Sequence, residues 1–310
     1  MLSSSSHSSS SKQCISAIEL WRWRRQVCQQ TTNVDAPEQE VDWLLREVAG
    51  VDRLSLRLGM LNEHSMITLQ RSLSDLTQLW RQRIEERIPV QYLAGIVHWR
   101  HFSLKVSPAA LIPRPETELL IDLAIAAINQ SSLSSKLRQS PWVDLGTGSG
   151  AIALGLADAF PQAQIYATDC SGEALELAHQ NGLHVNLANR IQFRQGYWFL
   201  PLQDLQGKLG GIVSNPPYIP SRVLLNLPPE VTHHEPHLAL DGGIDGLDCI
   251  RHLVETAPDY LQPGGIWLIE MMAGQAETVK ALLWEQGVYQ NIQIHQDLAG
   301  IERFASAERY

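Results

Sequence analysis

The spacing of apolar residues changes twice along the chain and divides it into three regions. From residue 14 to about residue 90, Trp, Leu and Val recur among charges at helical spacing, as in "AIELWRWRRQVCQ", "EVDWLLREVAG" and "SMITLQRSLSDLTQLWRQRIEERIP". Gly50 is suited to end the second of these helices. We predict a small helical N-terminal domain over residues 14–90. It contains neither a glycine-rich loop nor an acid–base pair, which favours recognition or support over catalysis.

Around residue 100 the spacing of apolar residues shortens to every second position. Residues 99–106, "WRHFSLKV", alternate roughly between apolar and polar, which predicts extended structure and a β-hairpin linker over residues 91–110. Pro113 and Pro115 then hold the chain extended at the residues before them. We expect a helix to begin at about Pro115, because proline suits the first helical position and the acidic residues that follow favour a helix N-terminus.

Beyond Trp142, short apolar runs alternate with helical segments. The predicted strands are "WVDLG", "AQIYATD", "IQFRQ", "GGIVSN", "GGIWLIEM", "NIQIHQDL" and "ERFASAERY". Alternating β and α units imply a parallel sheet with helices on both faces, and a final pair joined by the short turn "AGIE" must be antiparallel. We therefore predict an α/β domain over residues 111–310, with a doubly wound, mostly parallel seven-stranded sheet and an antiparallel last strand.

The composition fits a folded protein in a reducing compartment. Of the 310 residues, 44% are hydrophobic and 18% are charged, which is typical of a globular protein with a substantial core. The four cysteines are scattered without a CxxC pair, which favours free thiols in the cytoplasm over disulfides or a zinc framework. The net charge of −9 argues against tight, sequence-independent binding to nucleic acid, which depends on Lys and Arg. We expect a cytoplasmic monomer without a nucleic-acid partner.

Two features bear on localisation. No apolar run approaches the roughly 18 residues that a membrane helix needs, so we predict no membrane partner. Residues 1–13, "MLSSSSHSSSSKQ", predict a disordered tail, because serine repeats bury too little apolar surface to offset the entropy of ordering. A Ser-rich organelle transit peptide is the alternative, but the first ten residues contain no Arg.

A glycine-rich turn, "DLGTGSGAIA", follows the first strand of the predicted sheet. Glycines let the backbone turn tightly and approach a ligand, and the helix beyond them begins with free N–H groups. Asp169 ends the second strand, where an acid can accept both hydroxyls of a ribose. Together these features predict a nucleoside site, although the turn alone does not decide between NAD and S-adenosylmethionine. The turn comprises Gly146, Thr147, Gly148, Ser149 and Gly150.

The fourth strand ends in "IVSNPPYIPS", which supplies two hydrogen-bond acceptors at the same edge of the sheet. The Asn215 side-chain carbonyl and the Pro216 backbone carbonyl can together hold a planar NH₂ group, while Pro217 fixes the peptide and Tyr218 lies against the flat face. Drawing both N–H bonds toward acceptors directs the nitrogen lone pair at an electrophile. A sulfonium methyl group is already activated, so positioning and electrostatics could suffice without a general base.

This combination of motifs resembles the S-adenosylmethionine-dependent glutamine N5-methyltransferases that modify peptide chain release factors. The likeness covers about residues 85–310, and the helical first third resembles the family's N-terminal bundle only in type. The likeness rests on five motifs, "LIPRPETE", "DLGTGSGAIALGLA", "IVSNPPYIP", "HEPHLALDGGIDGLD" and "PGGIWLIE". The resemblance implies a class I methyltransferase-like fold and an enzyme of translation termination.

The resemblance also implies roles for individual residues. The glycine turn would bind the methionine part of S-adenosylmethionine and Asp169 its ribose, with Trp198 near the adenine. Asn215 would touch this cofactor and, with the three residues after it, hold the glutamine of the Gly-Gly-Gln loop in class 1 release factors. Arg114 would lie with Glu116 in a segment that closes the site, and Glu235 in a loop near the substrate.

One position departs from the family. Similar sequences often carry Asp immediately before the aromatic residue at 198, where an acid can hold the adenine amino group. Here the residue is Tyr197, in "QGYWF". We expect backbone groups to take over this contact and the activity to survive.

Three other interpretations compete with this one. An adenine-N6 methyltransferase acting on DNA or RNA would use the same acceptors, but it calls for a basic surface, and the dense basic cluster "RWRR" reads more simply as a solvated helix face. A non-catalytic S-adenosylmethionine-binding module would be favoured by a degraded motif, and neither motif is degraded. A metal site at "HHEPH" is disfavoured, since the spacing is not H-E-x-x-H and Pro236 opposes the required helix. We predict no metal.

Overall fold

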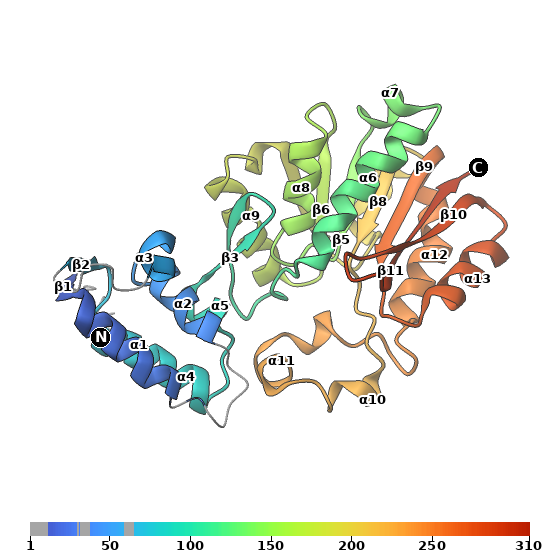
Figure 1. Ribbon diagram of the computed structural model, residues 1–310. Helices are drawn as coiled ribbons and strands as arrows, with labels where there is room; N and C mark the ends of the chain where they lie inside the picture. Colours follow the sequence, from blue (N-terminus) through green and yellow to red (C-terminus); the bar gives the residue numbers. More distant parts are fainter. Residues whose placement is uncertain (1–11, 30, 32–37, 59–64) are drawn as a thin grey trace, which may run out of the picture. The chain divides into compact units, whose positions relative to one another are not determined.

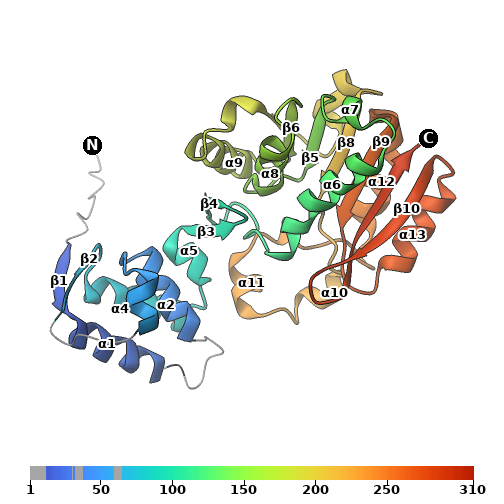
Figure 2. The same cartoon turned by 45° about the horizontal axis from the view of Figure 1, so that its top comes forward.

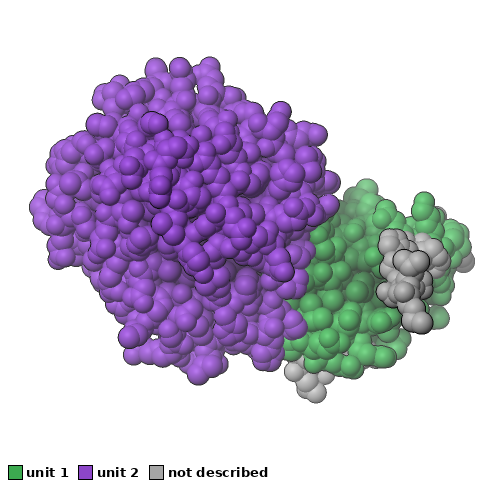
Figure 3. Space-filling view, turned by 180° about the vertical axis from the view of Figure 1, so that it is seen from behind, with its two compact units in different colours: residues 1–96 green, residues 97–310 purple. Residues whose placement is uncertain are grey.

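The computed structural model describes residues 12–29, 31, 38–58 and 65–310 and consists of two compact units, residues 1–96 and 97–310 (Figure 3). Residues 1–11 of the predicted tail lie outside the described residues. The boundary falls within the region that we assigned to a β-hairpin linker. Two strands are present there, β3 (Ile96–Trp99) and β4 (Phe102–Lys105), and they form a two-stranded sheet.

The first unit is mostly helical, but it also contains a small sheet that the sequence analysis missed. Its elements are β1 (Gln13–Ser16), α1 (Ala17–Gln29), α2 (Glu38–Glu47), α3 (Arg53–Leu58), β2 (Met66–Leu69), α4 (Leu73–Glu85) and α5 (Val90–Ala94). β1 and β2 pair antiparallel. The helix predicted through "SMITLQ" is therefore wrong, because α4 begins only after Ser72, which caps it reciprocally with Asp75. Strands of four residues are too short to reveal a two-residue period.

The second unit has the predicted α/β architecture. Its sheet has the strand order β10-β11-β9-β8-β5-β6-β7, and β11 is antiparallel to both of its neighbours while the other pairs from β9 to β7 are parallel. The seven-stranded doubly wound sheet with an antiparallel last strand is thus confirmed. The strands are β5 (Trp142–Leu145), β6 (Ile165–Asp169), β7 (Ile191–Gln195), β8 (Leu209–Ser214), β9 (Leu261–Glu270), β10 (Tyr289–Gln296) and β11 (Glu302–Arg309).

Helices cover both faces of this sheet (Figures 1 and 2). The α-helices are α6 (Leu119–Gln130), α7 (Ser134–Leu137), α8 (Ala151–Ala159), α9 (Gly172–His184), α10 (Ser221–Leu224), α11 (Pro229–His234), α12 (Asp248–Tyr260) and α13 (Ala276–Glu285). The 3₁₀ turns are η1 (Glu116–Glu118), η2 (Ala188–Arg190), η3 (Leu200–Leu205) and η4 (His237–Ala239). No helix in the described part of the chain is both long and apolar enough to cross a bilayer.

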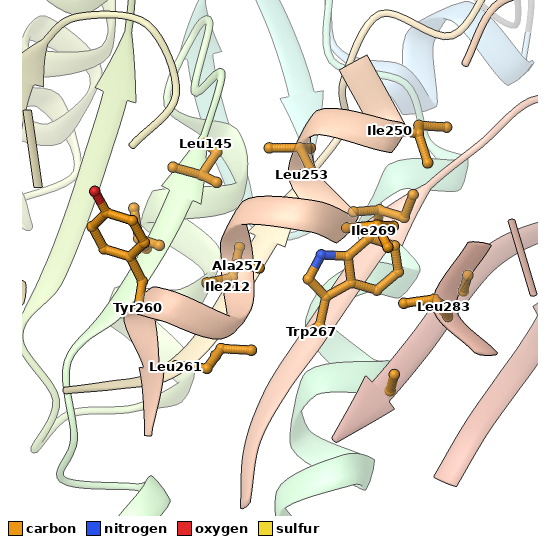
Figure 4. Packing of buried hydrophobic residues seen from close by; sticks show 14 of the residues in the cluster. Leu145, Ile212, Ile250, Leu253, Ala257, Tyr260, Leu261, Trp267, Ile269 and Leu283 are labelled. Carbon is orange, nitrogen blue, oxygen red and sulfur yellow. The ribbon is translucent and has the colours of Figure 1, made fainter. Parts of the chain in front are cut away.

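Alternating side chains of β5 explain why helices are needed on both faces. Trp142 points to the α8 side, where its ring lies 4.9 Å from that of Phe160. Val143, the next residue, belongs to the core cluster under α12 and α13, shown in Figure 4. On the neighbouring strand, a Cβ atom at Gly211 would lie 2.2 Å from the Trp142 ring, so only glycine lets the ring pack there. Both faces are buried, as parallel sheets require.

The register of the four central strands places their carboxyl ends in one row. Leu145 of β5 pairs with Thr168 of β6 and with Ser214 of β8, and Ser214 in turn pairs with Ile269 of β9. The residue that follows each of these positions is therefore found at the same edge of the sheet. In spatial order these residues are Glu270, Asn215, Gly146 and Asp169. Ligands of open α/β sheets bind beyond this edge.

Candidate active site

A cavity of about 420 Å³ opens at the carboxyl edge of the sheet. It is formed by the glycine turn, the ends of β6 and β8, the segment before η1 and the loop around η4. Of the residues predicted from sequence, nine line it: Arg114, Gly146, Thr147, Gly148, Ser149, Asp169, Trp198, Asn215 and Pro217. Four do not line it: Gly150, Pro216, Tyr218 and Glu235. Ligand cavities in proteins are commonly about 300 to 1,000 Å³, so this one is large enough for a nucleoside.

The glycine turn needs glycine for its backbone. Gly146, Gly148 and Gly150 have φ angles of +73°, +53° and +85°, in the left-handed region that other residues rarely adopt. The Gly148 N–H donates to Asp169 Oδ2 at 2.9 Å, and the Ser171 N–H donates to Asp169 Oδ1 at 2.9 Å. The carboxylate predicted to hold a ribose is thereby fixed between the turn and the N-terminus of α9.

Asn181 is a structural support of the turn that sequence reasoning missed. It is fully buried on α9, and its Nδ2 donates to the carbonyls of Ser149, at 2.9 Å, and of Lys105, at 3.0 Å. Its Oδ1 accepts from the Lys105 N–H at 2.7 Å. The amide thus ties β4 to the glycine turn. An asparagine within a helix gives no signal in the sequence that distinguishes it from a solvated one.

Asp144, in β5, is a second support of the turn that was not singled out. It is fully buried, and its Oδ2 accepts from Thr147 Oγ1 at 2.6 Å and from the Ala153 N–H at 3.0 Å. No partner within the described residues reaches its Oδ1. Burial raises the pKa of Asp144 to about 7; the two hydrogen bonds oppose this shift and the charge of Asp169 adds to it.

This pKa predicts a pH-dependent stability. A free Asp has a pKa near 3.9, so the folded protein binds the proton more tightly than the unfolded chain, and the free energy of unfolding falls as the pH rises from about 4 to about 7. Asp144→Asn keeps one carbonyl oxygen for both donors and removes the charge. We expect this variant to exceed the wild type in unfolding free energy by on the order of 2 kcal/mol at pH 8 and by less at pH 5. Urea unfolding of both proteins at the two pH values measures this, and a pH-independent difference would contradict it.

The aromatic residue expected near the adenine lies over the glycine turn. A Cβ atom on Gly146 would lie 3.3 Å from the Trp198 ring, so glycine is also required for this close approach. Trp198 has a φ of +48°, and its carbonyl accepts from Thr168 Oγ1 at 3.3 Å. Tyr197, which stands where the family often has Asp, lines the cavity as well and is 62% exposed.

Hydrogen bonds with Gln275 and Glu270 fix the segment from Asn215 to Tyr218. Gln275 Nε2 donates to the Tyr218 carbonyl at 3.1 Å and to the Gly246 carbonyl at 3.2 Å. Tyr218 Oη donates to Glu270 at 3.0 Å, and burial, together with this carboxyl, raises the pKa of the phenol. The ring of Tyr218 packs against the core cluster under α12. The Pro216 carbonyl receives no hydrogen bond from the described residues.

Arg114 and Glu235 are brought together, as an ion pair between segments 121 residues apart in the chain. Arg114 Nη2 lies 2.5 Å from Glu235 Oε1, and Glu235 Oε2 accepts from the Ile112 N–H at 3.3 Å. The side chain of Glu235 is 2% exposed, whereas that of Arg114 is 36% exposed. This pair fixes the loop after α11 against the segment that precedes η1, and each of these two segments contributes residues to the cavity lining. His237, two residues after Glu235 in "HHEPH", donates from Nε2 to the Thr232 carbonyl at 3.0 Å.

Among the residues that the structure describes, no group of three or more His, Cys, Asp and Glu side chains is arranged to hold a metal ion. The residues around the cavity instead fit a nucleoside cofactor. Left-handed glycines allow close backbone approach, Asp169 offers a carboxylate at the end of the second strand of the sheet, and Trp198 offers an aromatic face.

The sheet order, the glycine turn and the position of the cavity define an α/β domain of the class I methyltransferase type. The chain matches the Methyltransferase small domain family over residues 122–226. The solved structure of the hMettl16 catalytic domain in complex with MAT2A 3′UTR hairpin 6 has a TM-score of 0.55, over 91% of this chain and 95% of that chain. At 12% identity this likeness concerns the fold alone.

Sequence relatives narrow the class further. The release factor glutamine methyltransferase of Synechocystis sp. is 52% identical over 293 residues, which cover 94% of this chain and 97% of the relative. The protein of the same name from Thermosynechococcus vestitus is 45% identical, with 93% and 96% covered. The chain belongs to the release factor glutamine methyltransferase family.

Proposed function

We propose that this protein transfers a methyl group from S-adenosylmethionine to the side-chain nitrogen (N5) of the glutamine in the Gly-Gly-Gln loop of class 1 peptide chain release factors. It would act in the cytoplasm, as a monomer, on a protein substrate and without direct contact to nucleic acid. One observation carries the proposal. Strand register places Asn215 beside the glycine turn, and both line the same cavity.

Asn215, Pro216, Pro217 and Tyr218 are the proposed catalytic and substrate-binding residues. The glutamine amide offers two N–H donors, and the Asn215 side-chain oxygen and the Pro216 carbonyl would accept them. Because an amide nitrogen shares its lone pair with the carbonyl, it is a poor nucleophile. Drawing both hydrogens toward fixed acceptors favours a pyramidal nitrogen whose lone pair points into the cavity.

The cofactor would be held by the glycine turn and by residues that line the other half of the cavity. Gly146, Thr147, Gly148, Ser149 and Gly150 would hold its methionine part, Asp169 its ribose, and Trp198 would lie near the adenine. When bound, S-adenosylmethionine supplies an activated methyl group on a sulfonium. Asn215 lies between the two halves and would contact both ligands. Arg114 and Glu235 would shape the substrate side, because their ion pair fixes the loop there.

The test compares two release factors and DNA. With tritiated S-adenosylmethionine, the protein should label a class 1 release factor, and a release factor whose loop glutamine is replaced by alanine should receive no label. Labelling of both release factors alike would contradict the proposed target nitrogen. Labelling of adenine-containing DNA with neither release factor labelled would support the adenine-N6 alternative, which uses the same two acceptors.

A further inference from the structure

The proposed function requires Asn215 to adopt one of two orientations. An amide side chain presents an acceptor oxygen on one side and an NH₂ donor on the other, and the two have nearly the same shape. If Asn215 Oδ1 faces the cavity, it can accept from the substrate glutamine. If the amide is turned by 180°, the Asn215 NH₂ faces the NH₂ of the substrate glutamine, and the hydrogen bond between the two side chains is lost. The groups behind Asn215 must therefore determine the orientation.

A buried carboxylate lies behind it. Glu270 ends β9, is 1% exposed, and accepts from Thr117 Oγ1 at 2.6 Å. Thr117 is itself 4% exposed, and its Oγ1 accepts from Asn215 Nδ2 at 3.3 Å. Thr117 has one hydroxyl hydrogen, and because it is donated to Glu270 Oε2 it is not available to Asn215. The free lone pairs of Thr117 can only accept, and Asn215 must turn its NH₂ toward them.

The same carboxylate also holds the other end of the motif. Tyr218 Oη donates to Glu270 Oε1 at 3.0 Å, while Thr117 donates to Oε2. Burial raises the pKa of Glu270 and Glu116 adds to this shift, while the two hydroxyl donors and the charge of Arg303 oppose it. One buried carboxyl group is thus linked to both polar side chains of the Asn-Pro-Pro-Tyr segment.

We propose that Thr117 and Glu270 are positioning residues, which orient the Asn215 amide so that its carbonyl oxygen faces the substrate. This inference rests on the proposed function. It assigns a role to the threonine of "RPETE" and to the glutamate of "WLIE", which otherwise read as a helix start and a strand end. Neither residue needs to contact a reacting atom.

The test compares Thr117→Val with Thr117→Ser. Valine matches threonine in shape but lacks the hydroxyl, whereas serine keeps it. We expect Thr117→Val to lower kcat roughly tenfold, because the Asn215 NH₂ loses its partner in the productive orientation. KM for S-adenosylmethionine should change little, and Thr117→Ser should stay within about twofold of wild type. Equal kcat values for the two variants would overturn the proposal.

A binding measurement separates orientation from general structural damage. A release factor with glutamate in place of the loop glutamine presents only acceptors, so the wild-type protein should bind it more weakly than the natural one. In Thr117→Val the Asn215 amide can turn and donate to that carboxylate. The ratio of the dissociation constants for the glutamate and the glutamine release factors should therefore fall roughly tenfold. An unchanged preference would reject the orienting role even if kcat falls. In an Asn215→Ala background, Thr117→Val should lower kcat no further. A full additional loss of kcat in the double variant would also reject the orienting role of Thr117.

The two hypotheses fail differently. If wild-type protein does not methylate the release factor, the proposed function is wrong. If it does, but the Thr117 variants behave alike, only the orienting role is wrong. Should Thr117→Val not fold because Glu270 loses a donor, Thr117→Val combined with Glu270→Gln replaces the buried acid by a neutral amide. The same narrowed preference is expected of that double variant.

Discussion

Asn215→Ala is expected to lower kcat for methyl transfer by about 10²- to 10³-fold while the protein stays folded. Removing one preorganised polar group that acts on the reacting atom typically costs this much. Asn215 lines the cavity at the end of β8, and its only side-chain partner among the described residues is Thr117. Truncation should therefore leave the sheet intact. Single-turnover transfer to a class 1 release factor measures the rate, and the melting temperature reports the fold.

The matched control is Asn226→Ala. Asn226 is exposed in the turn after α10 and does not line the cavity, so the same truncation there should leave the rate within about twofold of wild type. If Asn215→Ala transfers methyl groups as fast as this control, the Asn215 side chain is not an acceptor in the reaction, whatever the effect of the substitution on stability.

Asp169→Ala is expected to weaken binding of S-adenosylmethionine by about 100-fold or more. Hydrogen bonds to a charged group contribute roughly 1.5 to 3 kcal/mol each, and the carboxylate would accept both ribose hydroxyls. It also holds the glycine turn through Gly148 and the start of α9 through Ser171. Both effects act in the same direction. Isothermal titration of the cofactor into the protein measures the dissociation constant directly.

Asp259→Ala serves as the comparison. Asp259 is exposed near the end of α12, outside the cavity, and carries the same charge. If both alanine variants bind the cofactor with wild-type affinity, the ribose does not lie at Asp169. Equal weakening in both would point to long-range electrostatics, because the exposed carboxylate has no contact with the site.

Much of the fold could be read from local patterns. The strands of the α/β domain are bounded by Gly, Pro and acidic residues, and each of the seven was predicted near its observed position. The two short strands of the first unit were not, because "QCIS" and "MITL" span four residues each and pair over a long separation in sequence. In such cases pairing partners, rather than local preference, decide the structure.

The site was predicted unevenly, for a similar reason. Asp169 and Asn215 are polar residues at the ends of apolar strands, which is a visible signal. Glu270 gives the same signal in "GGIWLIEM" and was overlooked, since nothing in its own segment shows what it faces. Thr117 and Asn181 act through partners elsewhere in the chain, so their hydrogen bonds exist only once the strands are aligned. Asp144 bonds to the nearby Thr147 and Ala153, but its burial likewise depends on the assembled sheet.

The sequence by itself determined the order of strands in the α/β domain, the glycine conformations of the turn and the residue types that could hold a nucleoside and a planar amide. These follow from short-range sterics and from the chemistry of single side chains. The tertiary structure alone decided that Glu270 lies beside Asn215, with Thr117 between them, and that Arg114 meets Glu235. Strand register and packing set these distances, because they join segments that are about 100 residues or more apart in the chain.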